Sequence, residues 1–469
     1  MTIQLRDYQQ EAIDRVRQQF QKGKKKICFQ LSTGGGKTII AAFMIQNAIK
    51  KGLKVLFLVH LKELIQQTSD KIALLDVDHG IICQGYAPYQ AECQLAMVQT
   101  FARRLETNKF VPDLIIVDEF HHCTSNTYKK VVEAFPNAKL VGLTATPQRL
   151  DGKGLEEVAE VLVEGPTTKQ LIQGGYLNQY KYYSVANELD VSNVHTKMGD
   201  FDKKELDEEI ERSGIIGDVV SHYNKYLSGK KAIVFCTKVA HSIDVCDRFK
   251  AAGISAAHLD GRLDKQTRAS IISDFKEGKI RVLTNCSLIS EGFDVPDTDG
   301  VIMLRPTLSL ALHLQMVGRG LRVSDHPTII LDHVGNYKRH GMPDDERVWT
   351  LKGRTKRQKK EAEISVTVCE KCFAVYSSDK RECPLCNTQR KTIVRNDIEE
   401  HDGELEEING VPIQRNDTGS IKRTSLNQLT RQCKSLEDLK SLAQKLGYKS
   451  GWALHIWKMR NEKRGRRIR

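Results

Sequence analysis

The sequence contains no long apolar run. None of its stretches approaches the ~18 consecutive apolar residues that a membrane-spanning helix requires, and its amino-terminal residues lack the apolar core of a signal peptide. Internal repeats are also missing at the level of the sequence. These absences argue against a membrane protein, a secreted protein and a repeat protein, so we expect a cytoplasmic, nucleoid-associated protein.

Acidic residues are fewer than basic residues, which leaves a net charge of +13 over 469 residues. A chain of this length is expected to form two or three domains, each with its own core. The excess of positive charge favours a polyanionic partner, such as nucleic acid or an anionic membrane. Of the twelve cysteines, four form one tight cluster and eight are scattered. The scattered cysteines are expected to be small buried apolar side chains, which fits a reducing compartment.

Short apolar runs alternate with amphipathic stretches over residues 1–165 and again over residues 231–345. This alternation predicts an α/β fold with two tandem domains, each built on a parallel sheet with helices on both faces. The expected strands are Lys26–Leu31, Lys54–Val59, Leu114–Asp118, Lys139–Thr144, Ala232–Cys236, Ser255–His258, Arg281–Asn285, Gly300–Arg305 and Pro327–Asp332. The expected helices include Tyr8–Phe20, Thr38–Lys50, Leu61–Ile72, Asp244–Ala251, Lys265–Lys276 and Ser309–Gly318.

Three other segments lack this alternation. Residues 166–230 are expected to connect the two domains, with a solvated helix at Asp200–Arg212, where charges crowd together. Residues 362–392 follow a basic linker and contain the clustered cysteines. Residues 393–469 are expected to form a basic, partly disordered tail that ends in helices, because Leu436–Leu446 shows helical spacing.

A glycine-rich loop, Thr33–Thr38, joins an expected strand to an expected helix. Its three glycines, Gly34 to Gly36, let backbone N–H groups point at an anion, and the helix N-terminus adds partial positive charge. Lys37 would reach the β- and γ-phosphates of a nucleotide, and the Thr38 hydroxyl would bind Mg²⁺. The alternative is a chance glycine-rich loop with a solvated lysine.

Two carboxylates, Asp118 and Glu119, follow the apolar run Leu114–Val117. Ligands bind at the carboxyl ends of the strands in open α/β sheets, so both side chains are expected beside the glycine-rich loop. Asp118 would hold Mg²⁺, directly or through water, and Glu119 would orient and deprotonate the attacking water. The alternative is an ordinary acidic turn at the end of a strand.

Arg319 and Arg322 lie three residues apart, and Gln315 lies four residues before Arg319. On a helix these spacings allow the side chains to share a face. Planar, permanently charged guanidinium groups suit phosphate oxygens, so the arginines would stabilise charge on the transferring γ-phosphoryl group. If they do so from the second domain, closure and opening of the two domains would accompany each hydrolysis. A pair of surface arginines is the alternative.

The cysteine cluster consists of two Cys-x-x-Cys pairs, Cys369 with Cys372 and Cys383 with Cys386. Four thiolates suit tetrahedral Zn²⁺, and a segment this small needs a metal for its folding energy. We therefore expect a zinc ribbon with a structural Zn²⁺; two disulfides or a redox pair are the alternatives.

The end of the chain combines Trp452 and Trp457 with basic residues up to Arg469. The tryptophans are expected in the core of a small helical pair, and the alternative is that they stack on unpaired bases. The terminal arginines are expected to bind backbone phosphates.

Taken in order, these motifs resemble those of superfamily 2 helicases and translocases of the DExH type. The resemblance covers residues 3 to 340 and rests on Leu5–Gln9, Leu31–Thr38, Val59–Leu64, Val98–Thr100, Asp118–His121, Leu143–Gly152, Ile233–Phe235, Thr284–Pro296 and Gln315–Arg322. Ser32 stands where proline is usual. The cysteine module after the last motif is similar to that of the RadD-type DNA-repair helicases of bacteria.

The resemblance implies two RecA-like domains that hydrolyse ATP with Mg²⁺. It implies that Arg6 and Gln9 sense adenine, that Gly292 and Asp294 contribute from the second domain, and that Thr144 and Thr146 couple the phosphates to a nucleic-acid strand. It further implies movement on DNA in the 3′→5′ direction, with replication or recombination proteins as partners in replication, repair or recombination.

Three other functions have to be weighed against the same residues. The chain could be an RNA helicase, or the nucleic-acid-binding motor subunit of a restriction or defence complex. No nuclease-like cluster of carboxylates and a lysine follows the motor, which argues against an intrinsic nuclease but not a partnered one. A binding module without catalysis would require a dead phosphate site, yet every key polar position is occupied.

Overall fold

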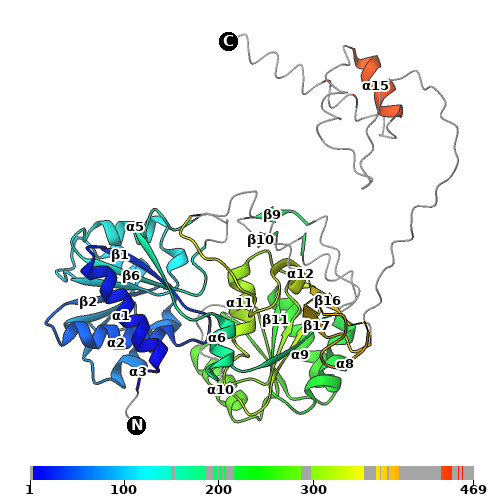
Figure 1. Ribbon diagram of the computed structural model, residues 1–469, viewed down its shortest axis with the longest axis horizontal. Helices are drawn as coiled ribbons and strands as arrows, with labels where there is room; N and C mark the ends of the chain where they lie inside the picture. The colour runs from blue at the N-terminus through cyan, green and yellow to red at the C-terminus, as the bar shows by residue number, and fades with distance from the viewer. Residues whose placement is uncertain are drawn as a thin grey trace. The chain divides into compact units, whose positions relative to one another are not determined.

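The computed structural model describes residues 4–148, 154–184, 194–197, 200–202, 205–206, 216–286, 297–352, 366–369, 371–377, 380–389, 435–445, 453 and 457. The chain divides into two compact units, residues 1–392 and 393–469. The first unit contains two parallel sheets, shown with their helices in Figure 1. We call the residues around the first sheet (4–164) the first lobe and those around the second sheet (180–340) the second lobe.

The first lobe has a seven-stranded parallel sheet in the order β3-β4-β2-β5-β6-β1-β7. Its strands are β1 (Lys26–Gln30), β2 (Val55–Val59), β3 (His79–Ile82), β4 (Cys93–Met97), β5 (Leu114–Val117), β6 (Lys139–Thr144) and β7 (Val161–Glu164). Its helical segments are α1 (Asp7–Gln21), α2 (Lys37–Ile49), α3 (Lys62–Ala73), α4 (Val98–Arg103), η1 (Phe120–His122) and α5 (Asn126–Glu133).

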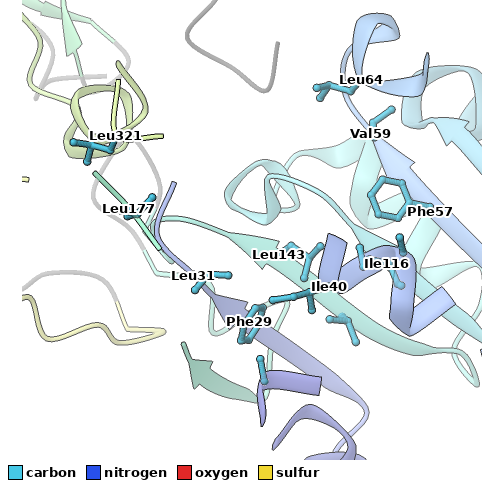
Figure 2. Packing of buried hydrophobic residues seen from close by; sticks show 14 of the residues in the cluster. Phe29, Leu31, Ile40, Phe57, Val59, Leu64, Ile116, Leu143, Leu177 and Leu321 are labelled. Atoms are coloured by element: carbon cyan, nitrogen blue, oxygen red, sulfur yellow. The ribbon is translucent and has the colours of Figure 1, made fainter. Parts of the chain in front are cut away.

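Both faces of this sheet are covered, because alternate residues of each strand enter different apolar clusters. Phe57 packs with residues of α1, α2 and α3, whereas Leu56 and Leu58 pack with residues of α4 and α5. Strands buried on both faces read as continuous apolar runs, and β2 (VLFLV) and β5 (LIIV) do so. Figure 2 shows part of the first cluster around Phe29, Ile40 and Phe57.

The second lobe has a six-stranded parallel sheet in the order β12-β13-β11-β14-β15-β8. Its strands are β8 (Tyr180–Ser184), β11 (Ala232–Cys236), β12 (Ala256–Leu259), β13 (Val282–Cys286), β14 (Gly300–Met303) and β15 (Thr328–Asp332). Its helices are α8 (Ile216–Leu227), α9 (Val239–Ala251), α10 (Lys265–Lys276), α11 (Leu310–Gly318) and α12 (Asn336–His340). The expected α/β class with two tandem parallel-sheet domains is confirmed.

Within residues 166–230 the structure departs from the sequence-based expectations at two places. β8 lies inside the segment that we expected to be a connection, and it pairs with β15 at the edge of the second sheet. Only a long-range pairing places it there, and its run YKYYS has no strongly apolar alternation. Asp200–Phe201, expected to begin a solvated helix, is strand β10 and pairs with β9 (Thr196–Lys197). The Asp200 carboxylate accepts hydrogen bonds from the Thr307 hydroxyl (2.9 Å) and the Leu308 amide (2.7 Å), which favours the strand.

Two segments connect the lobes. The interlobe linker, residues 165–179, contains α6 (Thr168–Gln173) and leads into β8. The return segment, residues 341–352, leaves α12 and reaches the first lobe again. There the Leu155 amide donates to the Leu351 carbonyl (2.7 Å), and Leu351 packs against the first lobe's core. Trp349 of the return segment lines a small cavity of about 40 Å³ with Ser32 and Thr33.

The cysteine module and the tail are described over short stretches. β16 (Val366–Val368) and β17 (Val375–Ser377) form an antiparallel pair beside the four cysteines. In the second unit, α15 (Leu436–Lys445) confirms the expected helix, and Ser435 caps it by accepting from the Asp438 amide (3.0 Å). Trp452 and the terminal arginines lie outside the described residues. No helix within the described part of the chain is long and apolar enough to cross a membrane.

Arg347 organises the return segment, and its replacement should destabilise the protein. Its guanidinium donates to four carbonyls at 2.7 to 3.3 Å, those of His340, Met342, Pro343 and Asp345. Arg347→Ala removes these bonds and is expected to cost about 2 kcal/mol, seen as a lower Tm. Lys352→Ala, at an exposed position of the same segment, is the control. Equal Tm values for the two variants would contradict this role.

Candidate nucleotide-binding site

The glycine-rich loop lies between β1 and α2, at the carboxyl end of the first sheet. Gly34 and Gly36 have φ values of 84° and 87°, a left-handed conformation that favours glycine. A Cβ on Gly36 would lie 2.4 Å from the Gln9 side-chain nitrogen, and one on Gly35 would lie 2.8 Å from Leu31. Glycine is therefore required at these positions by backbone conformation and by close packing.

Lys37 and Thr38 begin α2 directly after this loop. The Lys37 ammonium group donates to the Leu31 carbonyl (3.2 Å), so it folds back over the loop. The N-terminus of a helix carries partial positive charge, and Lys37 and Thr38 lie in the first turn of α2. This arrangement fits the β- and γ-phosphates of a nucleotide.

Gln9 of α1 is hydrogen-bonded to the glycine-rich loop. It is buried, and its side-chain nitrogen donates to the Gly35 carbonyl (3.3 Å), which also accepts from the Tyr8 hydroxyl (2.8 Å). The Gln9 side-chain oxygen accepts from the Arg6 amide (3.0 Å). Arg6 itself lies with its guanidinium carbon 5.0 Å from the centre of the Tyr176 ring.

Asp118 and Glu119 follow β5, and Thr144 ends β6. Because β5, β6 and β1 are neighbours in the sheet, the carboxylates come out beside the glycine-rich loop. Glu119 has a φ of 48°, a strained conformation for a residue with a side chain. The Asp118 carboxylate accepts from the Glu119 amide (3.0 Å).

Burial first, and the neighbouring Glu119 charge second, raise the pKa of Asp118 to about 6 against the opposing effect of Lys37. A buried carboxylate with a neighbouring like charge is stabilised by a divalent cation. Asp118 and the Thr38 hydroxyl both line the same cavity, so these two oxygens are suited to hold Mg²⁺.

A chain of polar contacts joins the carboxylates to the loop after β6. His121 lies 3.4 Å from a Glu119 carboxylate oxygen and 3.4 Å from the Thr144 hydroxyl. The Thr144 hydroxyl in turn donates to the Thr146 carbonyl (2.8 Å) and accepts from the Thr146 amide (3.1 Å). The geometry therefore links the two threonines to Glu119, as a coupling role would require.

Residues of both lobes line one cavity of about 500 Å³. The first lobe contributes Lys37, Asp118 and Glu119, and the second lobe contributes Arg319 and Arg322. The volume lies in the range of ligand sites. The other residues that line it are Arg6, Thr33, Gly34, Gly36, Thr38, Leu64, Gln67, Thr68, Lys71, Tyr176, Leu177, Asp297 and Val323.

Close packing holds the lobes together at this cavity. A Cβ on Gly318, the last residue of α11, would lie 2.5 Å from the Thr33 methyl group. Leu177 of the linker lies between Leu31 of the first lobe and Leu321 of the second (Figure 2), and all three belong to one apolar cluster. The two lobes and the linker are therefore in direct contact beside the cavity.

Not every residue expected at the site lines the cavity. Gln315 is buried in α11, one turn before the end that reaches the cavity, and it is not among the lining residues. Gly292 and Asp294 lie outside the described residues. Arg322 lies 3.5 Å from the Asp297 carboxylate, and both side chains are partly exposed.

Three linker residues at the site escaped the sequence analysis. The Thr168 hydroxyl donates to the Ser32 hydroxyl (3.0 Å), Tyr176 contacts Arg6 and Tyr8, and Leu177 packs on Gly34. No spacing rule identifies them, because they approach the loop only through the chain's path between the lobes. The pair Gly174-Gly175 before Tyr176 was the available signal of a turn.

The four cysteines form a second candidate site. Their sulfur atoms all lie within 4.8 Å of one another, with 3.5 Å between Cys369 and Cys386 and between Cys372 and Cys383. A disulfide requires about 2.05 Å, whereas Zn–S bonds of about 2.3 Å in a tetrahedron separate the sulfurs by roughly 3.8 Å. The cluster therefore fits a structural Zn²⁺ and not two disulfides.

Comparison with known families agrees with this geometry. A family model described as the res subunit of type III restriction enzymes matches residues 2–149, and one described as the helicase conserved C-terminal domain matches residues 215–324. A 51.5 kDa protein of a Lactococcus phage is 36% identical over 76% of this chain and 76% of its own length. This chain belongs to the superfamily 2 helicases. It is an ATP-dependent helicase or translocase, and hence an NTPase.

Further relatives of this helicase show how far the likeness extends. The DNA 3′-5′ translocase XPB2 of Sulfurisphaera tokodaii is 28% identical over 71% of this chain and 82% of that protein. The structure of the type ISP restriction-modification enzyme LlaBIII bound to DNA shares the fold, with a TM-score of 0.55 and 19% identity over 71% of this chain and 28% of that one. Two yeast relatives are longer, and the match spans 51% and 59% of their lengths.

Tyr176 should contribute to nucleotide affinity. It lines the cavity beside Arg6, and an aromatic ring next to a guanidinium is a suitable surface for a base. Tyr176→Ala is expected to raise the KM for ATP by about tenfold, as the loss of one stacking contact of about 1–1.5 kcal/mol implies. Tyr176→Phe, which keeps the ring, is the control. An unchanged KM in the alanine variant would show that the ring does not contact the base.

Magnesium binding should depend on pH through Asp118. Its pKa of about 6 means that the carboxylate is charged above pH 6 and protonated below it. Because Mg²⁺ binds the charged form, its apparent affinity is expected to fall about tenfold for each pH unit below 6. ATPase activity against Mg²⁺ concentration at pH 5, 6 and 7.5 measures this. The pH dependence of ATPase activity should disappear when the assays are repeated at saturating Mg²⁺. If it persists there, a titrating group other than Asp118 is responsible.

Proposed function

We propose that this helicase is a DNA-dependent ATPase that moves along or unwinds DNA in replication, repair or recombination. The observation that carries the proposal is the single cavity to which one lobe contributes Lys37, Asp118 and Glu119 and the other contributes Arg319 and Arg322. A site divided between two lobes changes shape when they move, so binding and loss of a nucleotide alter the distance between them.

Each residue has a role in this proposal. Lys37 and the N–H groups of the glycine-rich loop bind the β- and γ-phosphates, and Thr38 and Asp118 hold Mg²⁺, which neutralises phosphate charge. Glu119 accepts a proton from the attacking water. Arg319 and Arg322 stabilise the charge on the γ-phosphoryl group as it transfers, and an arginine in this role contributes about 10³–10⁵ in rate.

DNA as the partner is supported by two observations. The net charge is +13, which favours a polyanion. Relatives include a DNA 3′-5′ translocase and a restriction-modification enzyme solved with DNA. The four-cysteine cluster after the second lobe is compatible with a zinc ribbon of the kind found in RadD-type repair helicases, and we extend the proposal to that type and to 3′→5′ movement.

An ATPase assay across nucleic acids tests the function. Single-stranded, forked and gapped DNA should stimulate turnover of the full chain at least tenfold, with matching RNA giving little stimulation. Affinity for DNA should fall steeply between 50 and 200 mM salt, because phosphate contacts release counterions on binding. Stronger stimulation by RNA would overturn DNA as the substrate.

The matched variants in this assay are Lys37→Ala and Lys51→Ala. Lys37→Ala should abolish turnover and retain DNA binding, since it removes a phosphate ligand and leaves the DNA surface intact. Lys51 is an exposed lysine just beyond the end of α2 and should behave as the unmodified protein. Full activity of Lys37→Ala would end the case for this ATP site.

A further inference from the structure

β8 is the outermost strand of the second sheet. It pairs with β15 on one side, so its other side would present unpaired backbone groups. Exposed sheet edges invite pairing with other chains, and proteins commonly cover them. Here the cover comes from the cysteine module.

The turn after the first cysteine pair contacts this edge directly. The Ser184 amide of β8 donates to the Phe373 carbonyl (3.1 Å), and Tyr183 and Ala374 form an antiparallel bridge. The Tyr183 side chain packs against the buried cluster that contains Cys369 and Cys383. The module is thus bound to the second lobe through both backbone and side chain.

The Lys225 and Tyr226 side chains of α8 extend the contact. The Tyr226 ring lies 4.4 Å from the Tyr183 ring, and the Lys225 ammonium lies 5.9 Å from the centre of the Phe373 ring. Phe373 is itself more than a third exposed, so its ring is held on one side only. An element of the lobe other than β8 therefore also meets the module.

Both Cys-x-x-Cys turns have the same backbone geometry. The Phe373 amide donates to the Cys369 carbonyl and the Asn387 amide to the Cys383 carbonyl, each at 2.9 Å. Phe373 and Asn387 have φ values of 59° and 54°. Asparagine tolerates this left-handed conformation, whereas phenylalanine is strained in it. Phe373 needs an external constraint, and its conformation turns its carbonyl toward the Ser184 amide.

The module has too small a core to supply that constraint. Among its described residues, those that are buried are Cys369, Ala374, Val375, Tyr376 and Cys383, and of these Val375 belongs to the large apolar cluster of the lobes. A segment of this size depends on bound metal for its folding energy. The position of the Phe373 carbonyl, and with it the cover of β8, then depends on the same metal.

We infer that Zn²⁺ bound by the four cysteines holds the Phe373–Ala374 backbone against the free edge of β8. The module is in this way a metal-dependent part of the second lobe and moves with it. This inference rests on the zinc centre described above and adds a stabilising role within the lobe to it. The interlobe linker should be affected little, because Asn178 is held separately by hydrogen bonds with Leu321, His326 and Thr328.

Hydrogen–deuterium exchange of the full chain, read by mass spectrometry, tests the inference. The protein is compared as purified, after zinc removal by a chelator, and after zinc is restored, with metal content measured each time. Amides of β8 should exchange at least tenfold faster without zinc and recover when zinc returns. Amides of β11, in the centre of the same sheet, should change little. The KM for ATP should stay within about twofold.

A variant pair separates contact from metal. Tyr183→Ala removes the side chain that packs on the cysteines; it should retain zinc and still expose β8 to faster exchange. Lys181→Ala, at an exposed position of the same strand, should leave β8 protected. If the β8 amides exchange equally slowly in both variants, the Tyr183 side-chain contact does not hold the module.

The possible failures are distinguishable. Unchanged protection of β8 after confirmed zinc removal overturns the inference, even if ATPase activity still responds to DNA. Purified protein without bound zinc overturns both the zinc centre and the inference. Zinc-dependent protection in a protein that DNA does not stimulate supports the inference and removes the proposed function.

Discussion

The nucleotide-binding cavity depends on the close contact between Thr33 and Gly318. A single added methyl group on Gly318 would lie 2.5 Å from the Thr33 side chain, which is far inside van der Waals distance. The glycine-rich loop and helix α11 therefore meet with no space for another atom. Since α11 ends at this contact, the position of Arg319 relative to Lys37 follows from it.

The linker and the return segment surround the same contact. Thr168 and Leu177 touch the glycine-rich loop from the linker, and Trp349 approaches it from the return segment. Any change in the distance between the lobes must alter these contacts. The linker, which looks like a simple connection in the sequence, is thus part of the wall of the site, and the return segment lines the small cavity beside Ser32 and Thr33.

The cysteine module is another segment that packs against a lobe far from it in the sequence, here at the β8 edge of the second sheet. Its turn covers β8, and β8 continues directly from the linker that lines the nucleotide cavity. The three hydrogen bonds of Asn178 lie between these two regions of the chain and hold the linker in place independently of the module. A metal centre can in this way stabilise the lobe without controlling the affinity for the nucleotide.

The sequence by itself determined the α/β class, most strands within one or two residues, the glycine-rich loop, the two carboxylates and the four cysteines. These features are local: an apolar run, a glycine that needs positive φ, or a fixed spacing of thiols is visible in a few adjacent residues. Only the tertiary structure decided that β8 joins the second sheet, that Tyr176 and Thr168 reach the site, that Gln315 stays buried away from it, and that the cysteine module covers a sheet edge. Each of these outcomes depends on contacts between residues far apart in the chain, whose energies no local pattern records.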